Sequence, residues 1–129
     1  MTMAPTLHKK ERIVSKKLIA TLFEKGNSQS VAAYPLRAIY QKTERHEDCA
    51  PVQILISIPK KRFKHAVDRN RVKRQVREAY RHHKDLLSNV VAEKEQLLIA
   101  FVWIADTHVP SHDVEKKVIN ILQKVAERS

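Results

Sequence analysis

The chain has 129 residues and a mass of 15.0 kDa, enough for one domain with its own core. Its 25 lysines and arginines against 14 aspartates and glutamates leave a formal net charge of +11, so nucleic acid is the expected partner. One glycine, Gly26, and one cysteine, Cys49, exclude glycine-rich phosphate loops, internal disulfides and cysteine-based zinc sites. The longest apolar run, residues 97–105, is about half of the ~20 residues that a membrane span needs, so we expect a cytoplasmic protein.

Most of the charge excess lies in one stretch of the sequence. Residues 60–84 contain eleven basic and two acidic residues, whereas residues 26–59 are balanced and residues 85–129 have a small acidic excess. Interspersed charges of both signs would be sufficient for solubility. The concentration of positive charge therefore predicts a surface that contacts nucleic acid.

The first half of the chain alternates helix and strand signals. Apolar residues at helical spacing between Ser15 and Gly26 predict a first helix. Residues 31–40, interrupted by Pro35, are expected to form two short strands or one bent edge strand, and residues 43–51 a polar surface loop. Alternation of apolar residues over 52–58 predicts a strand with one buried face, ended by Pro59.

The second half contains the clearest patterns. Asp68 is the expected N-cap of a helix of about five turns, because Val72, Val76, Ala79 and Tyr80 follow at helical spacing. The run 97–104 predicts a central strand covered on both faces, and residues from 110 onward predict a last helix. The order α-β-β-β-α-β-α predicts one α+β domain over 1–129, a sheet backed by helices, with residues 1–8 as a flexible tail.

The helix after Asp68 has a basic side next to its apolar stripe. Arg69 and Arg71 stand at its start, where the helix dipole and free backbone N–H groups also attract phosphate. Glu78 is the one acidic residue that interrupts the basic surface. The rest of that surface is Asn70, Lys73, Arg74, Arg77 and Arg81. This pattern favours RNA or DNA binding over a merely solvated helix face.

Residues 66–81, AVDRNRVKRQVREAYR, resemble the signature of the bacterial ribonuclease P protein component, with an Arg-Asn-Arg core closely followed by Lys-Arg. Residues 7–26, with Arg12, Phe23 and Gly26, are similar to the first helix of that family. Ser57 with the Lys60–Lys61 pair resembles the end of its third strand. The likeness extends over about residues 7–127, apart from the middle loop.

The resemblance implies an α-β sandwich like the second domain of ribosomal protein S5, with a βαβ crossover. It implies a protein subunit that binds the catalytic RNA of ribonuclease P and the 5′ leader of precursor tRNA, and so assists removal of the leader by endonucleolytic cleavage. The sequence leaves the oligomeric state open, with a monomer favoured. The RNA would carry out the hydrolysis with magnesium, and the protein would supply no catalytic residue and bind no cofactor itself. The implied RNA-binding residues are Lys60, Lys61, Arg69, Asn70, Arg71, Lys73, Arg74, Arg77 and Arg81. The implied leader cleft contains Arg12, Ile19, Phe23 and Tyr40.

The sequence departs from the family pattern at three positions. Pro59 stands where serine is usual, and Ile19 replaces an aromatic residue. Phe63 stands in a loop that usually contains glycine and is here one residue longer. Since proline fixes φ and phenylalanine avoids positive φ, we expect a stiff loop between the third strand and the basic helix.

Other functions compete with this reading. A structural RNA-binding protein of ribosomal type would share the charge and the fold, but the Arg-Asn-Arg helix argues against it. A DNA-binding module is less well supported, because the sequence shows no second helix at helix-turn-helix spacing. A nuclease would need clustered carboxylates or paired histidines. His108 and His112 are separated by Pro110, which opposes a shared helical metal site, and Trp103 is expected in the core.

Overall fold

The computed structural model of the chain describes residues 20, 22–23, 28–44, 51–88, 90–91 and 94–128. Ala20, Leu22 and Phe23 are helical and belong to the predicted first helix. The predicted tail over residues 1–8, the residues Arg12 and Ile19, and most of the predicted middle loop lie outside the described residues.

Four strands form one sheet in the order β1-β2-β4-β3. The strands are β1 (Gln29–Ala33), β2 (Leu36–Glu44), β3 (Val52–Ser57) and β4 (Glu95–Trp103). Strand β2 pairs antiparallel with β1 and β4, whereas β3 pairs parallel with β4. The apolar run therefore becomes the central strand β4, as its composition predicts.

Strands β1 and β2 form a hairpin whose turn is Tyr34 and Pro35, joined by a cis peptide bond. The prediction of two strands in residues 31–40 is therefore confirmed, and the alternative of one bent edge strand is wrong. Strand β2 also continues to Glu44, beyond the expected start of the loop, because it pairs with β4 along its whole length. Pairing on both sides places β2 inside the sheet.

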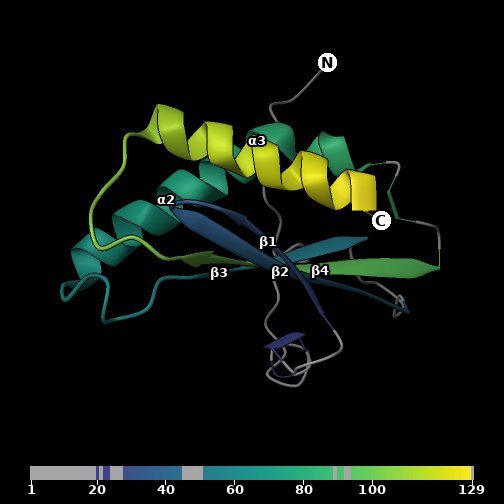
Figure 1. Cartoon of the computed structure of the whole chain (residues 1–129), viewed down its shortest axis with the longest axis horizontal. Helices are drawn as coiled ribbons and strands as arrows, with labels where there is room; N and C mark the ends of the chain where they lie inside the picture. The colour runs from purple at the N-terminus through teal and green to yellow at the C-terminus, as the bar shows by residue number, and fades with distance from the viewer. Residues whose placement is uncertain are drawn as a thin grey trace, which may run out of the picture.

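Two long helices cover one face of the sheet (Figure 1). Helix α2 (Ala66–His83) continues into a short 3-10 helix, η2 (Lys84–Leu87), and α3 (Ser111–Arg128) packs beside α2. Helix α2 connects the parallel neighbours β3 and β4, which is the expected βαβ crossover. Trp103, Tyr80 and Phe101 are the largest fully buried side chains of the core between the helices and the sheet.

Helix α2 begins three residues earlier than predicted. Its N-cap is His65, whose side chain makes no capping hydrogen bond, and Asp68 lies inside the first turn. The predicted cap at Asp68 is wrong because Asp68 is already helical; its carboxylate contacts His108, 3.0 Å away, instead of capping the helix. The predicted apolar stripe of α2 is confirmed, since all four of its residues are buried.

The other face of the sheet carries a second, smaller apolar cluster. Leu22 from the first helix packs there against Leu98 and Ala100 of β4, with Ile39 and Leu55 partly buried at its border. The short helical piece around Leu22 lies on this side in Figure 1. Strand β4 is thus covered on both faces. None of the described helices combines the length and the hydropathy required to cross a membrane.

Candidate RNA-binding surface

The outer side of α2 is a basic stripe directed away from the core. Residues of a helix advance by about 100° each, so a stripe opposite the buried Val72 and Val76 is formed by Asn70, Arg71 and Arg74. All three are exposed. Within the described residues, Arg71 and Arg74 make no ion pair. Their guanidinium groups are therefore available to phosphate, as the sequence predicts for this stripe.

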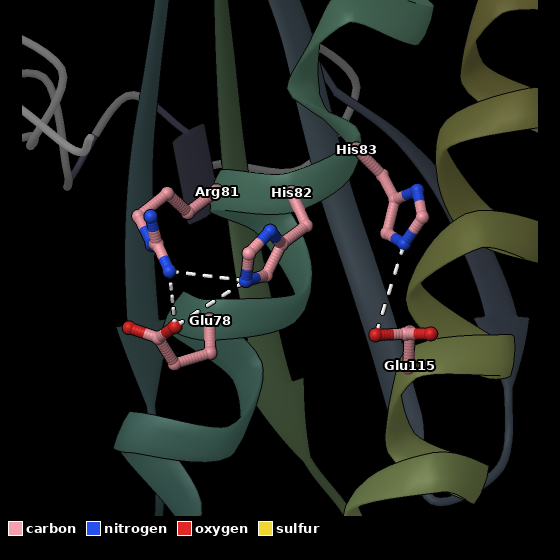
Figure 2. Close-up of polar contacts among 5 residues, drawn as sticks. All are labelled: Glu78, Arg81, His82, His83 and Glu115. Carbon is pink, nitrogen blue, oxygen red and sulfur yellow. Dashed lines mark hydrogen bonds and ion pairs between the residues drawn. The ribbon is translucent and has the colours of Figure 1, made fainter. Parts of the chain in front are cut away.

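Lys73, Arg77 and Arg81 are only partly exposed and border the stripe. Arg81 Nη2 donates a hydrogen bond to Glu78 Oε2 at 2.7 Å and lies 3.0 Å from His82 Nε2 (Figure 2). The hydrogen bond from Arg81 is the largest influence on the Glu78 carboxyl and lowers its pKa below the usual value. Part of the positive charge predicted to face RNA is therefore neutralised by Glu78.

The two adjacent histidines at the end of α2 point in different directions. His82 lies beside Glu78 on the outer side, whereas His83 faces α3, with its Nε2 3.8 Å from Glu115 Oε2 (Figure 2). Only His82 therefore adjoins the basic stripe, and His83 belongs to the contact between α2 and α3.

Arg69 has a different environment from Arg71. Its Nη1 donates hydrogen bonds to the backbone carbonyl oxygens of Phe63 at 2.7 Å and Lys64 at 3.1 Å. The side chains of Lys60 and Lys61 in the same loop are exposed. Arg69 is thus engaged with its own loop, which the motif alone does not reveal.

The segment between β4 and α3 is attached to the start of α2. His108 Nε2 contacts Asp68 Oδ1 at 3.0 Å, and Gln75 Nε2 donates to the Val109 carbonyl oxygen and to Ser111 Oγ. His108 thus pairs with a carboxylate. The two residues are 40 positions apart in the sequence, so no local pattern could have predicted the contact. Nowhere in the described ranges do three or more metal-ligating side chains come together.

The leader-cleft residues are not all on one face of the sheet. Phe23 is 45% exposed and adjoins Leu22, which packs on the face that α2 and α3 do not cover. Tyr40 is 3% exposed, lies in the core under the helices and donates its hydroxyl hydrogen to Gln29 Oε1 at 2.8 Å. Side chains alternate along β2, so Ile39 rather than Tyr40 shares the face with Leu22. We therefore remove Tyr40 from the cleft; Arg12 and Ile19 lie outside the described residues.

Comparisons with known proteins agree in one family. Residues 7–126 match the family model described as Ribonuclease P. The ribonuclease P protein component of Porphyromonas gingivalis strain W83 is 40% identical over 129 residues, covering 98% of this chain and 92% of the relative. That of Chlorobium phaeobacteroides is 40% identical over 90 residues, covering 68% of this chain and 60% of the relative.

Solved structures show the same fold. The ribonuclease P protein of Thermotoga maritima superposes with a TM-score of 0.67 at 20% identity, covering 88% of this chain and 96% of that one. A mutant of the Staphylococcus aureus protein gives a TM-score of 0.66 at 23% identity, covering 92% of this chain and 90% of the neighbour. From the match over nearly the whole chain and the 40% identity, the chain belongs to the bacterial ribonuclease P protein component family.

Proposed function

We propose that this protein binds the catalytic RNA of ribonuclease P through the outer stripe of α2, and the 5′ leader of precursor tRNA through the opposite face of the sheet. As a component of this ribonucleoprotein endoribonuclease, it assists removal of the leader. It acts in the cytoplasm as a single copy beside the RNA. The observation that carries the proposal is the exposure of Arg71 and Arg74, which form no ion pair with any described residue, in a chain that belongs to this family.

The charge of α2 supports binding to a folded RNA. Arg71 and Arg74 are one turn apart, a spacing that suits successive phosphates along a strand. Each phosphate they neutralise releases condensed counterions, which gives affinity without reading the base sequence. Lys60 and Lys61 extend the positive surface beyond the helix start. A catalytic RNA, held by shape and charge rather than by sequence, is the partner that such a surface fits.

The apolar face around Leu22 supports binding to a single strand. Phe23 exposes nearly half of its surface next to this face, and Ile39 and Leu55 are partly exposed there. An aromatic ring beside an apolar sheet surface can stack one unpaired base, irrespective of which base it is. The 5′ leader is the single-stranded part of precursor tRNA, so it is the segment that we place here.

We assign the hydrolysis itself to the RNA and its magnesium ions. The role of the protein is to lower the repulsion between two polyanions, the catalytic RNA and the substrate, which is greatest when magnesium is scarce. Its basic residues would then replace part of the screening that magnesium provides. The protein should therefore matter most at low magnesium concentration.

Reconstitution with the ribonuclease P RNA of the same host tests the proposal. We expect the protein alone to leave precursor tRNA intact, and the complex to cleave it at the mature 5′ end at magnesium concentrations where the RNA alone is slow. A ribosomal RNA fragment of similar length serves as the binding control. Equal affinity for both RNAs, without stimulated cleavage, would instead favour a structural RNA-binding protein. Cleavage by stringently purified, RNA-free protein would contradict the assignment of chemistry to the RNA.

A further inference from the structure

The two arginines of the Arg-Asn-Arg run project from different sides of α2. At about 100° per residue, positions 69 and 71 are separated by about 160° around the helix. Arg71 falls on the exposed stripe, whereas Arg69 lies near the buried side, beside Val72 and Val76, and is only partly exposed. A single motif thus places two identical side chains in two different environments.

Arg69 binds the loop that precedes its own helix. One guanidinium nitrogen, Nη1, donates to two successive carbonyl oxygens, those of Phe63 and Lys64. Hydrogen bonds from a charged donor are stronger than those from a neutral one, and the planar guanidinium holds its donors in a fixed orientation. A lysine at this position would keep the charge but would present a rotatable ammonium on a flexible stem. The loop conformation therefore depends on arginine in particular.

Phe63, a residue of the same loop, attaches the loop to the core. This side chain is 8% exposed, and its ring stacks on that of His108 with centroids 4.6 Å apart. The His108 ring in turn contacts Asp68, the residue next to Arg69. Its Nδ1 is buried without a hydrogen-bond partner among the described residues, so Nε2 is the ring nitrogen that makes the contact with Asp68. The loop is thus attached to α2 through Arg69, and to the segment after β4 through the stack of Phe63 on His108.

A third contact joins the loop to that segment. Arg62 Nη1 lies 3.1 Å from Asp106 Oδ1, and the Arg62 backbone N–H donates to the Pro59 carbonyl oxygen at 3.0 Å. The lysines at positions 60, 61 and 64 all stand on this fixed backbone with exposed side chains. If the loop were disordered, ordering it on RNA binding would cost conformational entropy before these lysines could contact RNA together.

We propose that Arg69 is a positioning residue, which together with the Phe63–His108 stack fixes residues 59–65 so that three loop lysines extend the RNA-binding stripe of α2. Arg71 contacts the RNA, and Arg69 acts through the loop. This inference rests on the proposed function, which it deepens by dividing the motif between two tasks. It also explains the phenylalanine in this longer loop, because its ring supplies the anchor in the core.

Hydrogen exchange in the free protein tests the positioning role without RNA. In Arg69→Lys, we expect faster exchange of the amides of residues 60–65, with the Arg62 amide as the reporter because it is hydrogen-bonded within the loop. His108→Phe, which keeps a ring for stacking but loses the bond to Asp68, should accelerate the same amides less. Arg71→Ala is the matched control and should leave them unchanged. Unchanged exchange in Arg69→Lys would overturn the inference.

Affinity for the catalytic RNA supplies the second arm. Arg69→Lys should weaken binding about three- to tenfold, the equivalent of about one net hydrogen bond. The same substitution should have almost no effect when Lys60, Lys61 and Lys64 are all alanine, because no loop lysine remains to be positioned. An equal loss in both backgrounds would make Arg69 a direct RNA contact and overturn the inference. If the Arg71→Ala and Arg74→Ala variants bind the catalytic RNA with wild-type affinity, the proposed function itself is contradicted, whatever the result for Arg69→Lys.

Discussion

Replacement of Glu78 by glutamine should strengthen binding to the catalytic RNA at little cost in stability. Glu78 follows Arg74 by one turn on the outer side of α2, and its side chain is half exposed. It is the only acidic residue that the sequence places on this stripe. The substitution removes a charge that repels phosphate and releases Arg81 from the ion pair at 2.7 Å.

The expected gain in affinity is modest and depends on salt. A unit charge about 6 Å from a phosphate in water contributes about 0.7 kcal/mol, or roughly threefold in affinity. If the released Arg81 then contacts a phosphate, the slope of log affinity against log salt should steepen by roughly 0.7 to 0.9. The exposed pair is worth only about 0.2–0.5 kcal/mol to the fold, so the melting temperature should fall by about 1–2 °C.

The dependence of this stability difference on pH follows from the pKa of Glu78. The hydrogen bond from Arg81 lowers that pKa below 4.5 in the folded protein. A carboxyl group whose pKa is lower in the folded state adds stability above its unfolded pKa, and this stability is lost as the pH falls through the folded pKa. Wild type should therefore melt slightly above Glu78→Gln at pH 7, and the two should converge once the pH falls below the lowered pKa of Glu78 in the folded protein.

Filter binding across a potassium chloride series measures the affinity change, and calorimetry across pH measures the stability change. Glu115→Gln is the matched control, because Glu115 lies on α3 near His83 and away from the stripe. It should not change RNA affinity. Unchanged affinity and slope in Glu78→Gln, or an equal gain in Glu115→Gln, would refute the placement of RNA on the outer side of α2.

Three further substitutions test the core anchor and the leader face. Phe63→Ala should destabilise the fold by about 3–5 kcal/mol in urea titrations, as expected for a buried ring, and a wild-type midpoint would contradict the anchoring role. Phe23→Ala should weaken binding of precursor tRNA by roughly 1–3 kcal/mol per stacked base and leave mature tRNA unaffected; equal losses for the two RNAs would argue against stacking on the leader. Tyr40→Phe should cost about 1 kcal/mol of stability through its lost bond to Gln29 without changing leader binding, and a leader-specific loss would return Tyr40 to the cleft.

The elements with a strong apolar period could be predicted from the sequence. Helix α2 buries Val72, Val76 and Tyr80 on one side, and α3 has a comparable buried stripe. Strand β4 is apolar from Leu97 to Trp103 because both of its faces are covered. In these elements packing allows only one choice of face, so pattern and structure agree. The basic stripe could be predicted as well, since it is the complement of the buried one.

What the sequence could not predict depends on contacts between distant residues. Tyr40 and Ile39 are adjacent in β2, and a difference of one residue reverses the face of a strand. Asp68 contacts His108, which is 40 residues away in the sequence, instead of capping α2, and nothing near Asp68 indicates this contact. Arg69 and Arg71 look equivalent in the motif, and only the loop carbonyl oxygens distinguish them.

The salt dependence of binding to the catalytic RNA tests the central claim most directly. Wild type and the double variant Arg71→Ala with Arg74→Ala are compared with the same RNA over a range of potassium chloride concentrations. Both side chains are exposed, so the variant should keep the wild-type melting temperature. We predict weaker binding at low salt and a slope smaller by roughly one unit or less for each lost phosphate contact. Wild-type affinity with a wild-type slope would place the RNA on another surface and contradict the account.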